Sequence, residues 1–417
     1  MKKKNSSILT VFFTVFIDLL GLGIVIPILP ALIINPTANL LPFDTTFSQR
    51  TIIYGFLIAS YPIMQFFGAP ILGTLADRFG RKKILSLSLF GTWIGYLLFI
   101  IGILTQDIYL LFIGRSIDGF TGGNISIAQS AISDISTEEN KSRNFGLIGM
   151  AFGLGFVFGP YIGGKLSDPS VVSWFSFETP FYLALLLTTL NILLVYKMFP
   201  ETLKEKSTRK IDLLAGFKNL GKAVSHPQMR SIFMVVFLLT IGFNFFTQFF
   251  QVFLISKFSF SQSQIGDLFA YMGLWIAVAQ GAFLRPLSKK FSSQTILSFS
   301  IILLAFTFPL LLLPDKAIWI YVIIPFIAIF QGLTQPNTTA IVSGLSDAKS
   351  QGEILGMNQS IASLAQAIPP IVAGFLTAIN VNLPTLFAAG STLLAWFVFK
   401  FLFKQRKSTV TLATENS

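Results

Sequence analysis

The sequence predicts an all-α membrane protein whose twelve transmembrane helices form two pseudo-symmetric six-helix bundles. Three observations lead to this prediction: the composition, a series of twelve long apolar runs, and a sequence repeat between the two halves. Of the 417 residues, 53% are hydrophobic and only 12% are charged, whereas soluble chains carry about 25% charged residues. So few charges could not cover the surface of a soluble globule, and the composition indicates a chain embedded in lipid.

Each apolar run is close to the length of about 20 residues that an α-helix needs to cross a bilayer. The runs lack the alternating pattern of barrel strands, and lipid offers the backbone no hydrogen-bond partner, so we expect helices. The predicted spans are 8–34, 51–75, 84–104, 108–132, 143–166, 179–199, 229–255, 263–284, 294–313, 318–342, 352–379 and 383–403.

The basic residues give the orientation. The chain has 30 Lys and Arg, and nearly all of them fall in the termini and in the loops on one side of the predicted spans. The exceptions are Arg50, Lys165, Lys257, Lys316 and the intramembrane Arg115. By the positive-inside rule both termini are expected in the cytoplasm. The net charge of +12 is then a topology signal, and we expect no nucleic-acid partner.

A polar segment at 200–228 separates two halves that repeat each other. The expected domains are a six-helix bundle at 1–199, a cytoplasmic linker at 200–228, and a second bundle with a short tail at 229–417. Segment 119–134 aligns without gaps with 332–347 and shares Gly, Thr, Asn, two Ser and Asp. Two further sets match in the same order: Gly146, Pro160 and Gly164 with Gly356, Pro370 and Gly374, and Gly73, Arg81 and Lys82 with Gly281, Lys289 and Lys290. Duplicated bundles of this kind bind substrate between the halves near the midplane.

The loop after the second span combines glycine, acid and base. It contains Gly73, Asp77, Arg78, Gly80 and Arg81. Glycine permits close helix approach and a tight turn, and a carboxylate can accept hydrogen bonds from arginine. The positive-inside rule explains the basic residues of this loop but does not explain its aspartate or its glycines.

This loop resembles the cytoplasmic signature loop of the major facilitator superfamily, and the twelve-span layout extends the resemblance over nearly the whole chain. The resemblance implies the major facilitator fold and a charged cytoplasmic latch closed by an acid at the end of the fourth helix. Asp134 occupies that position, with Arg143 just beyond it. The latch is expected to stabilise the state that opens outward.

The fifth span is rich in glycine and also contains proline. In membranes such residues form faces on which helices pack closely, and proline bends the helix. The segment 155–164 is similar to the antiporter motif of the drug-exporting branches of that superfamily, which implies exchange rather than symport. The motif residues are Gly155, Gly159, Pro160, Gly163 and Gly164.

Three charged residues lie deep in the predicted spans: Asp18 in the first, and Arg115 and Asp118 in the fourth. A charge at the bilayer centre costs roughly 3 kcal/mol on insertion scales, so each suggests a function. Arg115 and Asp118 share a helix face at i, i+3, whereas Asp18 has no basic neighbour in sequence. We therefore expect Asp18 to be the primary proton carrier and Asp118 to be modulated by Arg115. A structural ion pair between Arg115 and Asp118 is the alternative.

In the second half, side-chain amides lie on helical stripes among aromatic residues. Such a lining suits a mostly apolar ligand with a few polar groups, although amides also join helices to one another. The residues expected in a substrate cavity are Asn244, Gln248, Gln251, Gln331, Gln335 and Gln359.

Together these features predict a secondary transporter that exports amphipathic small molecules in exchange for protons. The sequence resembles the tetracycline-exporter group most closely, although exporters of tetracycline also carry acids in helices three and nine, where this chain has none. The expected location is a plasma membrane, such as the bacterial cytoplasmic membrane. The proton gradient would supply the energy without a cofactor or metal, and a monomer would suffice.

The sequence leaves three alternative functions to consider. A nutrient or metabolite carrier of the same fold would differ in its substrate and direction of transport. A membrane enzyme would need a catalytic cluster, but the chain has no Cys and a single His, in the linker. A receptor without transport activity would be expected to carry a folded domain outside the membrane.

Overall fold

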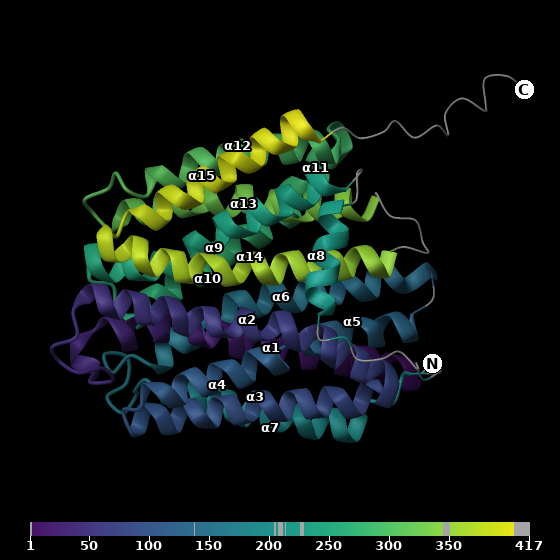
Figure 1. The fold of residues 1–417 in the computed structure, drawn as a ribbon, viewed down its shortest axis with the longest axis horizontal. Coiled ribbons are helices and arrows are strands. Elements are labelled where there is room, and N and C mark those ends of the chain that lie inside the picture. Colours follow the sequence, from purple (N-terminus) through teal and green to yellow (C-terminus); the bar gives the residue numbers. More distant parts are fainter. Residues whose placement is uncertain are drawn as a thin grey trace, which may run out of the picture.

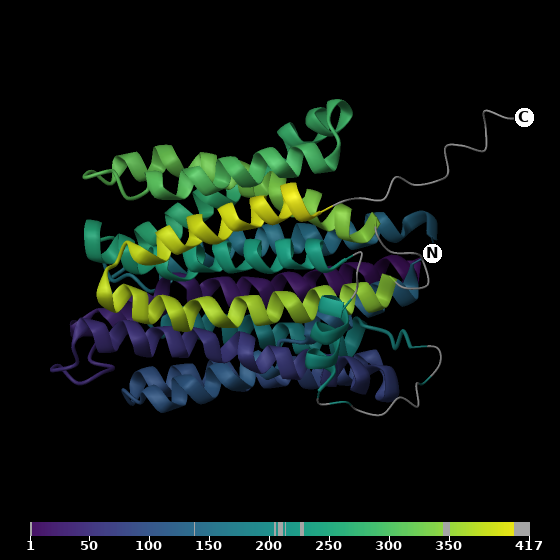
Figure 2. The ribbon, with the colours of Figure 1, turned by 45° about the horizontal axis from the view of Figure 1, so that its top comes forward.

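The computed structural model describes residues 2–136, 138–203, 206, 212, 214–225, 229–344 and 351–403. The side chains of residues 2–7, 138–143, 145, 344, 351–353, 355 and 356 lie outside that description. The described helices run side by side along one long axis (Figure 1). The start of α1 and the end of α15 lie at the same end of the bundle. Figure 2 shows the same bundle turned about that axis.

The helices of the first half follow the predicted order with short connections. They are α1 (Lys2–Ile34), the 3₁₀ turn η1 (Pro36–Ala38), α2 (Phe47–Phe79), α3 (Arg81–Leu104), α4 (Ile108–Thr121), α5 (Asn124–Ile135), α6 (Glu138–Leu166) and α7 (Thr179–Met198).

The second half repeats this plan after the linker helix α8 (Ala215–Ser225). Its elements are α9 (Arg230–Phe258), α10 (Gln262–Val278), the π-helical turn η2 (Ala279–Phe283), α11 (Leu284–Lys290), α12 (Ser293–Leu310), α13 (Ile318–Gly344), α14 (Gln351–Ile379), α15 (Leu383–Phe397) and the π-helical turn η3 (Val398–Leu402).

Among the described residues, eleven helices are long and apolar enough to cross a membrane. The predicted fourth span is the exception, because the structure divides it into α4 and α5 at Gly122 and Gly123. The two pieces have 14 and 12 residues, so neither reaches spanning length alone. The break follows Thr121, one turn after Asp118. The prediction of one continuous helix for the fourth span was therefore wrong.

The linker, for which the sequence predicted only a polar connection, contains a short helix. Phe217 of α8 packs edge-on against Phe66 of α2, with ring centroids 5.1 Å apart. Asn219 of the same helix donates to Ser360 of α14 at 3.2 Å. Helix α8 therefore contacts both halves at one end of the bundle.

We call this end the basic end, because the α2–α3 turn with Arg81, Lys82 and Lys83 and the end of α11 with Lys289 and Lys290 lie there. The opposite end, with the α1–α2 and α9–α10 connections, is the far end. The halves share one continuous apolar core toward the far end, which includes Ile28 and Phe181 of the first half and Phe250 and Phe308 of the second. Toward the basic end each half has its own core.

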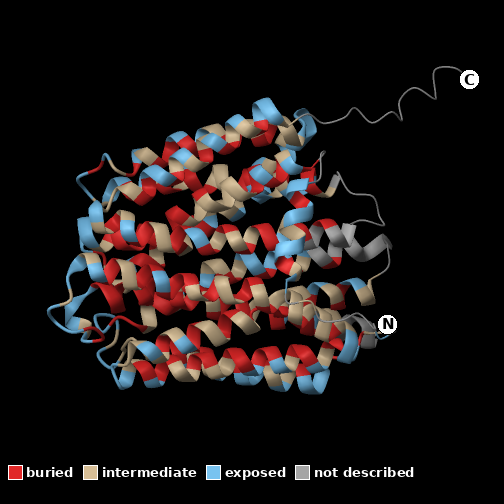
Figure 3. Cartoon of the chain, in the orientation of Figure 1, coloured by how far each residue is buried: buried red, intermediate tan, exposed pale blue. Residues whose placement is uncertain are grey.

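The buried residues run through the interior of the bundle, while exposed residues line its outside (Figure 3). Many of the exposed residues are large and apolar, among them Phe90, Leu186, Phe299 and Phe306. Apolar side chains on the outside of a helical bundle are what a lipid environment requires. This arrangement accounts for the low charge content of the sequence.

Glycines from the sequence repeat lie where the halves meet. In α6, Gly164 approaches Gly266 of α10 so closely that a Cβ on Gly266 would lie 3.2 Å from the Gly164 Cα. In α14, Gly374 approaches Gly55 of α2, and a Cβ on Gly55 would lie 3.3 Å from the Gly374 Cα. Since Gly164 and Gly374 are the matched residues of the repeat, the halves meet through two related contacts between glycine faces.

Candidate functional site

Asp18 lies buried in α1 beside the start of α5. Asn124, the first residue of α5, donates from Nδ2 to Asp18 Oδ1 at 2.7 Å. The second oxygen, Oδ2, is buried and has no hydrogen-bond partner among the described residues. No ion pair within the described part of the chain involves Asp18. The carboxyl group is thus held by one amide and keeps one oxygen free.

Arg115 and Asp118 meet on α4, as their spacing predicted. Arg115 Nη1 lies 3.6 Å from Asp118 Oδ2, which is an ion-pair distance but longer than a good hydrogen bond. The guanidinium carbon lies 4.6 Å from the ring centroid of Tyr61, a cation–π contact. Asp118 is also close enough to Asp18 to interact with it electrostatically. The structure therefore brings all three predicted intramembrane charges into one cluster.

The break between α4 and α5 places Asn124 in this cluster. Gly119 and Gly122 sit against Tyr61, where a Cβ on either glycine would clash with that residue. Gln65 Nε2 donates to the Gly122 carbonyl at 3.0 Å, and so pairs a backbone group that the interrupted helix exposes. The second helix can then begin at Asn124, with its amide directed at Asp18.

The antiporter-motif residues form the α6 face that packs on α1. A Cβ on Gly155 would lie 2.7 Å from Leu19 Cβ, and one on Gly159 would lie 2.6 Å from Gly23 Cα. Gly163 packs on the backbone of Ile24 in the same way. Gly164 faces α10 instead, as described above, and Pro160 lies inside the helix between the two contacts. The motif thus connects the helix that carries Asp18 to the second half.

The proposed latch residues come together around Arg81 at the basic end. Arg81 Nη1 lies 2.5 Å from Asp77 Oδ1, and Arg81 Nε donates to Asp134 Oδ2 at 3.2 Å. Gly80 has φ +110°, a conformation that favours glycine, which explains its place in the turn. Arg78 lies over the ring of Phe79, at 5.3 Å from the ring centroid to the guanidinium carbon.

The remaining latch residues have other surroundings. A Cβ on Gly73 would have no neighbour within 4 Å, so this glycine faces open space. The side chain of Arg143 lies outside the described residues. Among the described residues, the contacts of Arg81 stay within the first half and the start of the linker, and none of them joins the two halves.

Glu201, just after α7, belongs to the latch but was not predicted from the sequence. Its carboxylate accepts hydrogen bonds from the backbone N–H of Arg81 at 2.9 Å and of Lys82 at 3.2 Å. These are the first backbone N–H groups of α3, which have no partner within the helix. A carboxylate near a helix N-terminus is also electrostatically favourable. The adjacent Thr202 donates to Asp134. In sequence Glu201 looked like one more charge at the edge of the linker.

The amides expected in a substrate cavity are spread along α9, α13 and α14. Gln251 is buried, and its Oε1 has no partner among the described residues. Asn244 donates to its own helix at the Thr240 carbonyl, and Gln248 uses its backbone carbonyl to accept from Tyr54 of the first half at 2.8 Å. Gln331 is half-buried, and Gln335 and Gln359 are exposed. The structure does not gather these six residues into one described pocket.

Polar contacts that were not predicted from the sequence close the far end. Lys165 of α6 lies 2.8 Å from Asp267 Oδ2 of α10 and donates to Ser263 Oγ at 2.7 Å. Asp168 accepts from the Ser263 backbone N–H at 3.3 Å. Burial would raise the pKa of Asp168, but hydrogen bonds from Ser170, Ser261 and Ser263 hold that pKa below its ordinary value. We call Lys165, Asp168, Ser263 and Asp267 the far-end latch.

This fold, with two bundles meeting at one end and a charged cluster inside a span, defines a membrane transporter. A family model described as Major Facilitator Superfamily matches residues 11–368 and 232–416. The chain belongs to this family, which confirms the predicted family and fold class. It is a multi-pass membrane protein that transports small molecules and is not an enzyme.

Several curated relatives align over most of the chain. The chain is 30% identical to tetracycline resistance protein, class C, of Escherichia coli, over 89% of each sequence. It is 29% identical to multidrug resistance protein 1 of Bacillus subtilis (strain 168), over 93% of this chain and 94% of that protein. Identity to quinolone resistance protein NorA of Staphylococcus aureus (strain MRSA252) is 27%, over 97% and 98% of the two chains.

Solved structures agree on the fold. The human organic anion transporter MFSD10 superposes with a TM-score of 0.72 at 23% identity, covering 95% of this chain and 99% of that one. A D-xylose–proton symporter gives a TM-score of 0.74 at 15% identity, covering 95% and 97%. At these identities the likeness concerns the fold alone.

Proposed function

We propose that this protein is a proton-coupled antiporter that exports amphipathic small molecules from the cytoplasm by alternating access. The observation that carries the proposal is the buried cluster of Asp18, Asn124, Arg115 and Asp118, with a carboxyl oxygen left free on Asp18. A carboxyl group that is buried, unpaired by a base and able to bind one proton is what proton coupling needs. Relatives named for resistance to tetracycline, quinolones and several drugs support the export direction.

The proposed orientation places the basic end in the cytoplasm of a bacterium, with both termini on that side and the protein in the cytoplasmic membrane. The positive-inside pattern supports it. We infer that, in this orientation, the cytoplasmic end is the open one, because the apolar core shared by the halves among the described residues lies toward the far end. In the α6 and α10–α11 region, Gly149 and Gly281 have open space where a Cβ would project.

In the proposed cycle, substrate enters from the cytoplasm and the proton on Asp18 leaves as the cluster rearranges. Helix α1 carries Asp18, and α6 packs on α1 through its glycine face, so movement of one helix is transmitted to the other. The energy source is the proton gradient, with no cofactor, and one chain contains both halves of the pathway.

A substrate screen in proteoliposomes with an imposed pH gradient tests this function. The interior of the vesicles is made acidic, and right-side-out and inverted protein populations are separated by orientation-specific labelling. Amphipathic drugs should move against their gradient, and collapse of the pH gradient should stop that movement. Transport of a nutrient with no dependence on the pH gradient would favour the alternative carrier function.

The cytoplasmic latch gives a first prediction. Asp77→Asn should weaken the state in which the cytoplasmic end is closed, because the latch is proposed to reach the second half only in that state, whereas here Asp77 pairs with Arg81 within the first half. Asp77 is 39% exposed, so the effect is about 1 kcal/mol or less, a shift of up to roughly fivefold toward the cytoplasm-open state. The chain has no cysteine, so a single Gly149→Cys can report this state by its rate of thiol labelling, which should rise.

The matched control is Asp212→Asn, which breaks an exposed ion pair with Lys218 in the linker and should leave labelling unchanged. Equal labelling of Gly149→Cys with and without Asp77→Asn would show that the latch does not bias the two states.

The far-end latch predicts a shift in the opposite direction. Lys165→Asp sets two acids against each other across α6 and α10, which should favour the outward-open state and lower labelling of Gly149→Cys. Because both side chains are partly exposed, the expected change is roughly two- to fivefold. The charge swap Lys165→Asp with Asp267→Lys should restore the original rate. If the swap labels no faster than Lys165→Asp alone, the ion pair is not the cause.

A further inference from the structure

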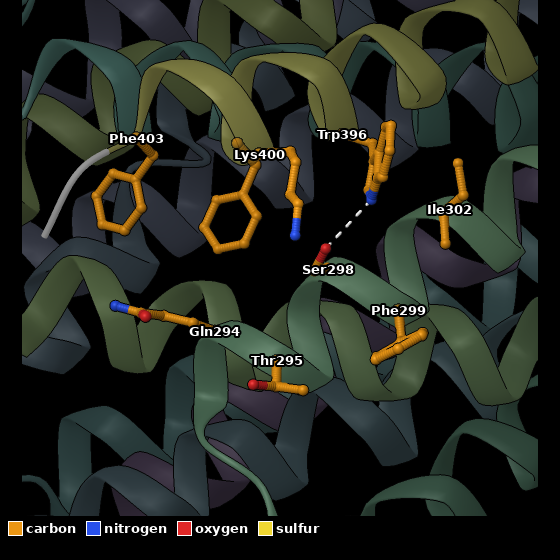
Figure 4. A pocket seen from close by; sticks show the side chains of 9 residues that line it. Gln294, Thr295, Ser298, Phe299, Ile302, Trp396, Lys400 and Phe403 are labelled. Atoms are coloured by element: carbon orange, nitrogen blue, oxygen red, sulfur yellow. Dashed lines mark hydrogen bonds between the residues drawn. The ribbon is translucent and has the colours of Figure 1, made fainter.

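A polar pocket lies on the outside of the second half, away from the charged cluster. It has a volume of about 390 Å³ and lies between the start of α12 and the end of α15 with η3. Figure 4 shows Trp396, Lys400 and Phe403 along one wall, and Gln294 and Ser298 along the other. No acidic residue is among the nine described residues that line it.

The pocket offers a cation, a hydroxyl donor and the N-terminus of a helix. Lys400 is exposed, its amine points into the space between the two walls (Figure 4), and no ion pair among the described residues involves it. Trp396 Nε1 donates to Ser298 Oγ at 3.2 Å, so the hydroxyl hydrogen of Ser298 remains available to a ligand. The N-terminus of α12 lies beside these groups and adds the positive end of its dipole.

The position of the pocket points to a lipid. It lies at the basic end, where the chain leaves the membrane. From it, Phe299 and Phe306 continue along the outer side of α12, 64% and 63% exposed. These rings form an apolar track that leads from the pocket toward the bilayer interior. The π-helical turn η3 carries Phe399 and Lys400 into the wall, and such irregular turns are frequent at functional sites.

We propose that this pocket binds the phosphate headgroup of an anionic phospholipid of the cytoplasmic leaflet. Lys400 neutralises the phosphate, the hydroxyl group of Ser298 donates to one of its oxygens, and an acyl chain follows Phe299. Basic pockets between membrane helices on the cytoplasmic side bind anionic headgroups in this manner. The site is independent of the export function, because none of its residues lies in the Asp18 cluster or between the halves.

Native mass spectrometry of the purified protein in neutral detergent tests the proposal, with phosphatidylglycerol, phosphatidylethanolamine and glycerol phosphate as probes. The wild type should retain phosphatidylglycerol in preference to phosphatidylethanolamine. Lys400→Gln should lower that preference by about fivefold, and Lys400→Arg should preserve it. Ser298→Asp, which places a carboxylate in the pocket, should abolish it.

Lys290→Gln is the matched control, because Lys290 is an exposed lysine of the same half and the same end that does not line the pocket. An equal loss in Lys290→Gln would mean that charge attraction is diffuse and would overturn the site. Binding of glycerol phosphate as strong as that of phosphatidylglycerol would replace the lipid by a small soluble anion.

Discussion

Replacement of Asp18 by asparagine should abolish uphill transport driven by a pH gradient. Asparagine has the same shape and can still accept the hydrogen bond from Asn124 that Asp18 Oδ1 accepts now, so insertion and folding should be preserved. It cannot bind and release a proton, so substrate can no longer be exchanged for one. We expect accumulation in proteoliposomes to fall to background while binding of an uncharged substrate persists.

Asp44→Asn is the control for this variant. Asp44 is an exposed acid in the α1–α2 connection, so its replacement removes the same charge without touching the cluster. Its transport should equal that of the wild type. Uphill transport by Asp18→Asn at more than a small fraction of the wild-type rate would exclude Asp18 as the obligatory proton carrier.

Replacement of Gly159 by leucine should also eliminate transport, for a steric reason. A Cβ at this position would lie 2.6 Å from Gly23 Cα and 2.8 Å from the Leu20 carbonyl oxygen, so the backbones of α1 and α6 would have to separate. Overpacking of this kind costs about 1–3 kcal/mol, and it displaces the helix that holds Asp18. We expect at least a tenfold loss of transport and a lower melting temperature in detergent.

Gly153→Leu provides the comparison on the same helix. No atom lies within 4 Å of a Cβ built on Gly153 in this state, so leucine can be accommodated there. Its melting temperature should stay close to that of the wild type. If Gly159→Leu and Gly153→Leu are equally stable and equally active, the close contact with Gly23 is not required.

The sequence alone predicted the helical fold and the family, because lipid leaves the backbone few options and the apolar runs are long. It also predicted that Arg115 and Asp118 meet, since their spacing places them on one helix face. The place of Asp18 beside them could not be derived in this way, because it depends on how α1 packs against α4 and α5. Asn124 stood in the repeated segment 119–134, which is the signal that could have drawn attention to it.

Other contacts depend on tertiary structure that leaves little trace in the sequence. Tyr61 was one aromatic residue among many, and its role under Arg115 follows from the packing of α2 on α4. Lys165 and Asp267 lie in different halves, so only the meeting of α6 with α10 pairs them. The predicted substrate amides could not be placed in the same way. A helical stripe shows that the amides share one side of a helix, but it does not show what that side packs against.

Proton release from the purified protein tests the role of Asp18 most directly. Substrate is added to the protein in weakly buffered detergent solution, and the pH change is recorded for the wild type, Asp18→Asn and Asp118→Asn. The wild type should release protons on binding, Asp18→Asn should release none, and Asp118→Asn should release protons with a shifted pH optimum. Normal release by Asp18→Asn would contradict the assignment, and loss in Asp118→Asn alone would exchange the roles of the two acids.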